Sequence, residues 1–240
     1  MKNINDIKNV YYINLVSRPD RKTKFEDEIK KLNIQANRFN AIKNKFGALG
    51  CSLSHLNLLK YAKINNLDHI LIMEDDILFL NPEIFINSIN KFLSSKINFD
   101  VLLIAGNNMG PYSKIDDFCV KINKCQTTTG YLVKQHYYDT LIQNFEQGVY
   151  KLSNNLNRLN DFAIDQYWTN LQLIDNWYLL TPLTVTQRPD YSDIEKRIIN
   201  YNIVMLDLDK TYLRQVGVIK EKEKQKEKIA NTLNDIIKNI

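Results

Sequence analysis

Glycine and proline are scarce in this 240-residue chain, which has seven Gly and five Pro. Apolar residues make up 44% of it, with ten Phe and thirteen Tyr among its aromatic residues. This composition excludes a disordered chain and indicates a folded globular protein. The length allows one large domain or two small ones.

Long apolar runs and paired cysteines are also missing. No window approaches the roughly 18 apolar residues of a membrane span, and residues 1–8 lack the apolar core of a signal peptide. We therefore expect a cytoplasmic protein. The three cysteines, Cys51, Cys119 and Cys125, form no Cys-x-x-Cys pair and no even set, which predicts buried, reduced thiols.

Charge of one sign is nowhere concentrated. Lys and Arg total 32 against 27 Asp and Glu, a formal net charge of +5, and no run of five like charges occurs. The small cationic excess is compatible with a polyanionic substrate or an anionic membrane surface, and equally with neither. No basic stripe with interleaved aromatic residues is present, which argues against nucleic-acid binding.

Strand and helix patterns alternate through the first half of the chain. Strands are predicted at 9–15, 39–42, 69–79 and 100–105, and helices at 20–32, 52–65 and 82–93. Two β-rich runs around 126–130, helices at 135–145 and 162–173 and a strand at 177–181 follow. The alternation predicts an α/β fold with a central, mostly parallel mixed sheet flanked by helices.

The composition changes near the C-terminus. A segment of alternating Lys and Glu precedes apolar residues at helical spacing, namely Ile229, Leu233, Ile236, Ile237 and Ile240. We expect one domain over 1–217 and a charged, amphipathic helix over 218–240. That helix packs on the domain or on a second copy, or makes a peripheral membrane contact.

The run from His69 to Phe79 is the most informative stretch, because apolar residues deliver Glu74, Asp75 and Asp76 to a strand end. Burying carboxylates without partners costs about several kcal/mol, so such a cluster normally faces a cation or a cleft. Oxygen ligands at a strand end suit Mg²⁺ or Mn²⁺, which most often hold nucleotide phosphates. An acidic turn closing an ordinary strand is the alternative.

A second polar cluster follows the first predicted strand. The turn from Ser17 to Arg21 should lie at the same sheet edge as the acids, because ligands of open α/β sheets bind beyond the carboxyl ends of the strands. Arg18 and Arg21 can neutralise phosphate there. A helix-start turn with an exposed Arg21 is the alternative.

Several motifs in order along residues 11–194 resemble glycosyltransferase family 25. They are Ile13-Asn14-Leu15 with Arg18, Asp20 and Arg21, then Phe39 to Ile42, Leu49 to His55, Ile72 to Ile77, Thr129 to Val133, Ile164-Asp165, Pro182-Leu183, Gln187 and Ser192 to Ile194. That family includes bacterial lipooligosaccharide galactosyltransferases and collagen hydroxylysine galactosyltransferases. Any one of these matches alone would be weak.

The resemblance implies a GT-A type fold and a metal-dependent hexosyltransferase. The expected reaction moves galactose or glucose from a UDP-hexose, with inversion, to a saccharide or glycolipid acceptor such as lipooligosaccharide. Mn²⁺, or Mg²⁺, is the expected cofactor. A catalytically silent nucleotide- or glycan-binding module on the same scaffold is the alternative, although such a module has no physical reason to keep three adjacent acids.

The resemblance also implies roles for residues on the donor side. Asp76 is the expected direct metal ligand, with Glu74 as its partner or a ribose contact. The donor nucleotide is expected to contact Asn14, Leu15, Arg18, Arg21, Ala41, Ser54, Glu74 and Asp75. No histidine follows His136, so water, the diphosphate or Gln187 is left to complete the metal shell.

On the acceptor side we expect Thr129, Gly130, Tyr131 and Gln187, although a simple hairpin would use the same threonine-rich run. An inverting reaction needs a base for the attacking hydroxyl. Asp165 is the candidate, with Tyr167 and Trp168 close by to stack on a sugar, and Asp161 is the second choice. A helix-capping acid is the alternative for Asp165. His55, on the helix face of Cys51 and Ser54, is either a buried hydrogen-bonded residue or a ligand contact.

Overall fold

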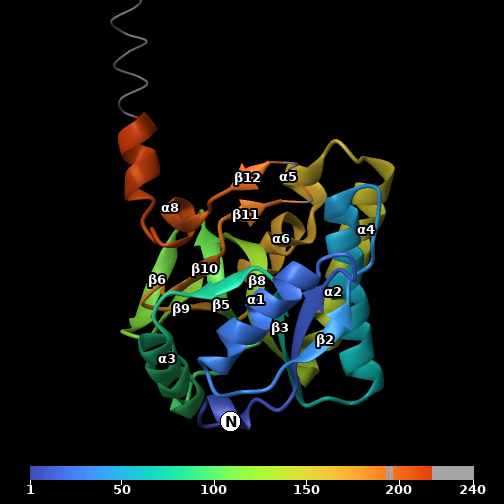
Figure 1. The fold of residues 1–240 in the computed structure, drawn as a ribbon. Helices are drawn as coiled ribbons and strands as arrows, with labels where there is room; N and C mark the ends of the chain where they lie inside the picture. Colours follow the sequence, from blue (N-terminus) through green and yellow to red (C-terminus); the bar gives the residue numbers. More distant parts are fainter. Residues whose placement is uncertain (193, 195–196, 218–240) are drawn as a thin grey trace, which may run out of the picture.

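The computed structural model describes residues 1–192, 194 and 197–217, and the predicted helix over 218–240 lies outside them. At its centre is an eight-stranded sheet (Figure 1). In spatial order the strands are β2 (Asn37–Asn40), β1 (Val10–Asn14), β3 (His69–Glu74), β8 (Cys125–Lys134), β5 (Val101–Asn108), β9 (Trp177–Leu180), β7 (Cys119–Ile122) and β6 (Tyr112–Asp116). Strands β8 and β7 run against the other strands, which all share one direction.

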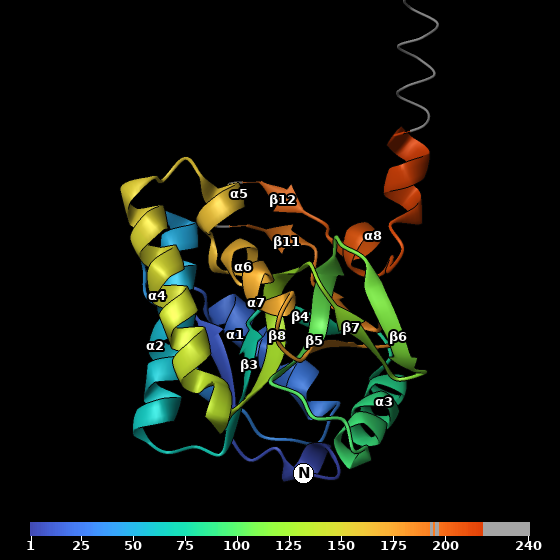
Figure 2. The same cartoon turned by 180° about the vertical axis from the view of Figure 1, so that it is seen from behind.

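Helices cover both faces of this sheet (Figures 1 and 2). The long ones are α1 (Pro19–Lys30), α2 (Gly47–Ile64), α3 (Pro82–Ser94) and α4 (Tyr138–Asn154). Side chains alternate across β3, so Ile70 and Ile72 join the core with α2 and α4, whereas Leu71 and Met73 join the core with α1 and α3. The predicted α/β fold with a mostly parallel mixed sheet between helices is therefore confirmed.

Helix α2 starts at Gly47, five residues before the predicted start at Ser52. The start lies close against the loop that follows β2, since a Cβ atom on Gly50 would come within 2.7 Å of the Ile42 carbonyl oxygen. Glycine permits this approach because it has no side chain. The approach places the first turns of α2 beside the carboxyl ends of β1 and β2.

The segment predicted as one strand over 69–79 is two strands in the structure. After β3, the chain turns at Asp75 and Asp76 and continues as β4 (Ile77–Phe79). Strand β4 leaves the main sheet and pairs antiparallel with β10 (Val185–Gln187). A residue from a distant part of the chain holds this turn, because the Arg188 N–H donates a 2.6 Å hydrogen bond to the Asp76 carbonyl. The acids therefore occupy a turn at the sheet edge.

Two other predictions in the second half differ from the structure. The threonine-rich run 126–130 is not a hairpin turn but lies inside β8, which pairs with β3 and β5, while β7 pairs with β6 and β9. The helix predicted over 162–173 is divided into α5 (Leu159–Phe162), α6 (Ile164–Tyr167) and α7 (Thr169–Gln172). An extended backbone at Ala163, with ψ of 145°, separates the first two.

The remaining elements are short. They are η1 (Ile4–Asp6), η2 (Gln135–Tyr137), α8 (Asn202–Met205), and the strand pair β11 (Asp190–Tyr191) and β12 (Ile198–Ile199). Within the described ranges, no helix is both long enough and apolar enough to cross a bilayer. All three cysteines are free. Cys119 and Cys125 are buried, as predicted, whereas Cys51 is only half-buried.

Candidate active site

A cleft of about 800 Å³ opens at the carboxyl edge of the sheet. Its described lining comes from the ends of β1, β3, β5 and β8, from α1, α2, α5 and α6, and from the segments after β2 and β10. Strands β1, β3 and β5 share one direction, so their carboxyl ends meet here, and the antiparallel β8 contributes its amino end. Candidate residues from distant parts of the sequence therefore meet in one place.

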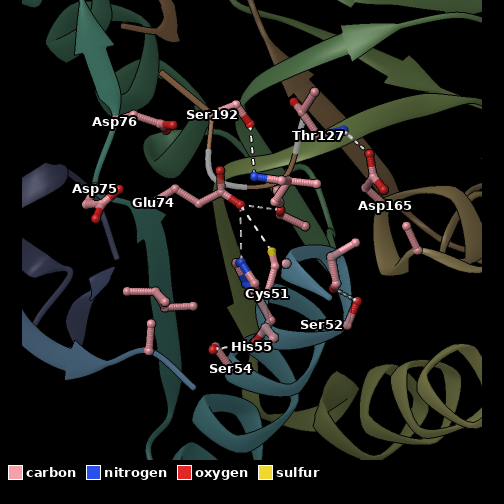
Figure 3. A pocket seen from close by; sticks show the side chains of 18 of the residues that line it. Cys51, Ser52, Ser54, His55, Glu74, Asp75, Asp76, Thr127, Asp165 and Ser192 are labelled. Atoms are coloured by element: carbon pink, nitrogen blue, oxygen red, sulfur yellow. Dashed lines mark hydrogen bonds and ion pairs between the residues drawn. The ribbon is translucent and has the colours of Figure 1, made fainter. Parts of the chain in front are cut away.

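Glu74, at the end of β3, is enclosed by side chains from other elements (Figure 3). Thr128 Oγ1 donates a hydrogen bond to Oε1, and Gln187 Nε2 donates one to Oε2 over 3.0 Å. His55 Nε2 lies 3.4 Å and Cys51 Sγ 3.7 Å from Oε1. Burial alone would raise the pKa of Glu74, but His55 and Thr128 hold this pKa below its ordinary value. Glu74 is thus a carboxylate with protein partners on both oxygens.

Asp75 is also held on both oxygens. Asn14 Nδ2 donates to Oδ2 over 2.6 Å, and Arg21 Nη1 lies 3.0 Å from Oδ1. Asn14 is itself fixed, because its Oδ1 accepts a 2.9 Å hydrogen bond from Arg38 Nε. Burial raises the pKa of Asp75, and the charge of Arg21 opposes that rise. Asn14 and Asp75 together hold Arg21 at the sheet edge.

Asp76 is the acid with spare hydrogen-bonding capacity. Its Oδ2 lies 3.2 Å from Arg21 Nη1, whereas its buried Oδ1 has no hydrogen-bond partner among the described residues. Burial, followed by the negative charge of Glu74, raises the pKa of Asp76 to about 8. A buried polar atom without a partner is costly and requires an explanation. A cation beside Asp76 Oδ1 would provide one.

A second group of potential metal ligands surrounds Glu74. Cys51, His55 and Glu74 each offer one ligand atom, and these atoms lie within 4.8 Å of one another. Asp76 is not a member of this group. Burial raises the pKa of the Cys51 thiol well above its ordinary value, which keeps it protonated and a poor ligand until a metal displaces the proton. Metal binding by Glu74 and Asp76 stays a prediction.

Asp190, in the segment after β10, completes a charged cluster with the two predicted arginines. Its Oδ2 lies 3.5 Å from Arg18 Nη2 and 3.8 Å from Arg21 Nε. Arg21 Nη2 also donates a 3.0 Å hydrogen bond to the Tyr191 carbonyl. The cluster therefore connects the turn before α1 to the strand β11, which borders the cleft.

Arg188 is a cleft residue that the sequence interpretation missed, as it missed Asp190. Its Nη2 donates a 2.8 Å hydrogen bond to the buried Glu28, and its own Nε is buried without a partner among the described residues. A sequence signal for both residues exists, because Arg-Pro-Asp occurs at 18–20 and again at 188–190. The arginines of both copies line the cleft.

Asp165, in α6, also lines the cleft. In Figure 3 it lies on the opposite side of Glu74 from Asp75 and Asp76. Its Oδ2 accepts a 3.1 Å hydrogen bond from the Thr127 N–H, and Gln166 Nε2 lies 3.4 Å from the same oxygen. Burial raises the pKa of Asp165, the Thr127 hydrogen bond opposes this, and the charge of Glu74 adds to the rise. A carboxylate with a raised pKa is suited to accept a proton near neutral pH. Asp161, the second choice, is not among the lining residues and pairs with Arg158 over 2.8 Å.

The other predicted donor contacts differ in accessibility. Leu15 and Ala41 line the cleft. Ser54 also lines it, but its buried hydroxyl accepts a 2.8 Å hydrogen bond from the Ile42 N–H and donates a 2.7 Å bond to the Gly50 carbonyl. The Ser54 side chain therefore ties α2 to the loop after β2, and its contact with a nucleotide stays a prediction.

Replacing Ser54 by alanine is expected to lower the free energy of unfolding by about 1–3 kcal/mol, because the partly buried Ile42 N–H loses its acceptor. Ser52→Ala is the matched control. Ser52 lies in the same helix and donates to the Ala48 carbonyl over 2.8 Å, but no backbone N–H is shown bonded to its hydroxyl. Urea unfolding measures both variants, and equal losses would contradict the role of the Ile42 contact.

Most residues predicted for the acceptor side lie inside the sheet. Gln187 lines the cleft, whereas Thr129, Gly130 and Tyr131 are not among its lining residues. Thr129 and Tyr131 have no exposed surface, and the Tyr131 hydroxyl lies 2.8 Å from His55 Nδ1. The cleft is lined instead by the first part of β8, which includes Thr127 and Thr128. His55 is therefore a buried residue that lies between Tyr131 and Glu74.

The predicted stacking of Trp168 on a sugar is wrong. Trp168 is completely buried, and its Nε1 donates a 2.9 Å hydrogen bond to the Cys125 carbonyl. Tyr167 is not among the cleft residues, and its hydroxyl donates to Gln147 over 3.2 Å. The division of the predicted helix into α6 and α7 leaves the indole in the core.

Comparisons with solved structures give low similarities. A glycosyltransferase involved in glycosylation of the PBCV-1 major capsid is 11% identical, with 71% of this chain and 79% of that chain covered and a TM-score of 0.43. A Drosophila β-1,4-galactosyltransferase complex with manganese, UDP-galactose and xylobiose is 16% identical, with 55% and 50% covered and a TM-score of 0.33. A putative glucose-1-phosphate thymidylyltransferase from Bacillus anthracis is 11% identical, with 76% and 72% covered and a TM-score of 0.40.

The comparison with curated proteins gives no match. The comparison with family profiles does, and it matches residues 45–168 to glycosyltransferase family 25, described as an LPS biosynthesis protein. The matched range is more than half of the chain and includes α2, the three acids, β8 and Asp165. The chain therefore belongs to glycosyltransferase family 25.

Proposed function

We propose that this protein is an inverting, metal-dependent hexosyltransferase. It would move galactose or glucose from a UDP-hexose to a hydroxyl of a saccharide or glycolipid acceptor such as lipooligosaccharide. One observation carries the proposal: Asp76, with an unpartnered buried oxygen beside Arg21, and Asp165, with a raised pKa, contribute to the same cleft from different elements.

The charges around the cleft favour a bound cation. The acids among its described lining residues are Glu74, Asp75, Asp76, Asp165 and Asp190, five in all, and the bases are Arg18, Arg21, Lys43 and Arg188, four in all. When all five acids are ionised, a nucleotide diphosphate would therefore meet more negative than positive charge. Mn²⁺ or Mg²⁺ suits the carboxylate oxygen of Asp76 and reverses that balance.

The donor side then divides into separate roles. Asp76 would hold the cation, and Glu74, fixed by His55, Thr128 and Gln187, stays behind it as a partner or a ribose contact. When bound, the cation neutralises charge on the leaving diphosphate. Arg188 Nε, which is buried and unpartnered among the described residues, can donate to a phosphate oxygen.

The remaining donor contacts would position the nucleotide. Leu15 and Ala41 offer apolar surface at the ends of β1 and β2, and Arg18 contributes positive charge beside them. Ser54 and Asn14 act behind this surface, since their polar groups are bonded to Ile42 and Asp75. The nucleotide would thus lie along the carboxyl edge, where ligands of open α/β sheets bind.

Asp165 would serve as the base on the acceptor side. The attacking hydroxyl gives its proton to the Asp165 carboxylate as its oxygen bonds to the anomeric carbon and the UDP oxygen leaves. The Thr127 N–H holds one carboxylate oxygen, which leaves the other for the hydroxyl. We place the reaction in the cytoplasm, on acceptors in solution or at a membrane surface.

A screen of UDP-sugars tests this function. The protein is incubated with UDP-galactose, UDP-glucose and other UDP-sugars, Mn²⁺ and small saccharide acceptors, and products are identified by mass. A hexose added to an acceptor is the expected result. Calorimetry with UDP, with and without Mn²⁺, runs in parallel. Metal-assisted UDP binding without any turnover would contradict the proposed transferase activity and favour the catalytically silent binding module.

A further inference from the structure

The two sides of the cleft differ in chemistry. All four of its described basic side chains come from the donor side, from the segments around Arg18, Lys43 and Arg188. The lining residues of β5, β8, α5 and α6 include no Lys or Arg, and apart from Leu159 and Ile164 they are polar or acidic. The polar and acidic ones include Asn107, Gln126, Thr127, Asn160, Asp165 and Gln166. We call these six residues the polar wall.

Two atoms of the polar wall are buried without hydrogen-bond partners among the described residues. They are Asn107 Oδ1 and Thr127 Oγ1. Folded proteins satisfy nearly all buried polar atoms, so two such atoms in one wall of a cleft indicate groups that bind a ligand. Asn107 pairs in register with Gln126 across β5 and β8, which places it next to Thr127.

Thr127 has an unusual backbone conformation. Its φ is 73°, in the left-handed region that β-branched residues rarely adopt. In this conformation the Thr127 N–H donates a 3.1 Å hydrogen bond to Asp165 Oδ2. Strained residues of this kind concentrate at functional sites. One residue thus orients the Asp165 carboxylate and presents a hydroxyl beside it.

The unpartnered groups define what they can bind. Asn107 Oδ1 and the Asp165 carboxylate only accept hydrogen bonds, and the Thr127 hydroxyl both accepts and donates. A ligand with several neighbouring O–H donors matches this set, and the hydroxyls of a sugar ring have that arrangement. Asp165 belongs to this wall and Glu74 lies beside it, and no described Lys or Arg is hydrogen-bonded to either acid, so a carboxylate or phosphate on the ligand would be repelled.

We infer that the polar wall is the acceptor subsite, and that it binds an uncharged sugar ring through Asn107 and Thr127 while Asp165 receives the reacting hydroxyl. This inference rests on the proposed transfer reaction. It moves the acceptor contacts from Thr129, Gly130 and Tyr131 to the half-buried residues at the start of β8, which line the cleft, and to their neighbour on β5. Gln187, on Glu74, remains between the donor and acceptor sides.

The pair Thr127→Val and Thr127→Ser tests the subsite. Valine keeps the branched shape and the backbone N–H but removes the hydroxyl, so the KM for a neutral acceptor should rise about tenfold, while the KM for the UDP-sugar changes by less than twofold. Serine restores the hydroxyl and should recover most of the acceptor affinity. Thr140→Val, on an exposed position of α4, is the matched control and should change neither constant.

Matched acceptors test the charge preference. A set of neutral aryl hexosides is compared with the corresponding aryl uronides, which add one carboxylate, and the neutral compounds should be preferred at least tenfold. Asn160→Lys places a base on the exposed rim of the polar wall and should raise the uronide-to-hexoside ratio of kcat/KM about tenfold. Asn87→Lys, on α3, adds the same charge at an exposed position outside the cleft lining and should not change that ratio.

Saturation-transfer NMR of the same hexosides in the presence of UDP and Mn²⁺ makes the result independent of turnover. If the wild type binds hexosides and Thr127→Val binds them more weakly, the subsite is supported even when no sugar is transferred. In that case only the proposed function fails. Three results would overturn the inference. They are sugar transfer with an acceptor KM that Thr127→Val leaves unchanged, equal use of uronides and hexosides as acceptors, and no binding of any neutral hexoside. Circular dichroism confirms that each variant is folded.

Discussion

Replacing Asp165 by asparagine is expected to lower kcat for sugar transfer by a factor of about 10²–10⁴, the usual contribution of a general base. Asparagine has the shape of aspartate and can still accept the hydrogen bond from the Thr127 N–H through Oδ1. It cannot accept a proton at neutral pH. The loss should therefore appear in kcat, and the affinity for UDP with Mn²⁺ should stay within about twofold.

The pH profile gives the same assignment a second, independent readout. Only ionised Asp165 can act as a base, and burial raises its pKa above the ordinary value of about 3.8. Transfer by the wild type should therefore decline on acidification at a higher pH than an ordinary aspartate would produce. Below that pKa, kcat/KM should fall with decreasing pH, and this acidic limb should be missing from the residual activity of Asp165→Asn.

Asp161→Asn is the matched control for this experiment. Asp161 lies in α5, four residues before Asp165, but its side chain is about half exposed and pairs with Arg158 outside the cleft lining. Its replacement should leave kcat within about twofold of the wild type. A large loss in Asp161→Asn together with an active Asp165→Asn would make Asp161 the base and exclude the present assignment.

The main features of the sheet could be predicted from the sequence because local patterns determine them. The apolar residues of β3 alternate between two cores, and the strand ends where the first acid begins. Arg18 lies just before α1 and Arg21 in its first turn, and the parallel pairing of β1 and β3 brings Arg21 to the acids. Strand direction and ligand position at the carboxyl edge follow general rules of α/β folds.

The other half of the cleft depends on contacts between distant residues, which a local pattern does not contain. Arg188 and Asp190 lie at the cleft because β10 pairs with β4, which is more than 100 residues earlier in the sequence. The site of Thr127 depends on pairing of β8 with both β3 and β5, and the threonine-rich run alone resembles a turn. Where local propensity was ambiguous, the pairing of distant strands therefore determined which structure each segment adopts.

Trp168 illustrates the same limit in the helical part. An aromatic residue next to a candidate base has two reasonable places, a sugar-binding surface or the core, and its spacing is compatible with both. The structure buries the indole against Trp177 and Tyr131, with ring centroids 5.2 and 5.5 Å away. The apolar area gained by such burial outweighs any preference for the cleft. Neutral sugars bound at the polar wall would thus rely on hydrogen bonds more than on stacking.

Charge and hydrogen bonding explain why three adjacent acids coexist at this edge. Arg21 contacts Asp75 and Asp76, and Glu74 is held separately by contacts with His55, Thr128 and Gln187. Asp76 alone retains an unpartnered oxygen, and its pKa is raised to about 8. The folded protein therefore holds a proton on Asp76 more tightly than the unfolded chain does. Without a cation, Asp76 destabilises the fold as the pH rises from about 4 to about 8.

Replacing Asp76 by asparagine should consequently have opposite effects on stability and activity. At pH 8 the variant removes a buried negative charge that Arg21 only partly offsets, and we expect the free energy of unfolding to rise by roughly 2 kcal/mol. For a chain of this length that corresponds to roughly 4–8 °C in Tm. The gain should vanish below about pH 4, where Asp76 is protonated in both states of the wild type.

The same variant should lose sugar transfer and the response to metal. Mn²⁺ with UDP should raise the Tm of the wild type and leave that of Asp76→Asn unchanged, and calorimetry should detect no metal-assisted UDP binding. Asp117→Asn, whose side chain is 86% exposed, controls for the loss of a charge and should shift neither stability nor activity. A less stable Asp76→Asn that still binds UDP through Mn²⁺ would move the metal to the group of Cys51, His55 and Glu74, since these residues offer the other set of closely spaced ligands at this edge.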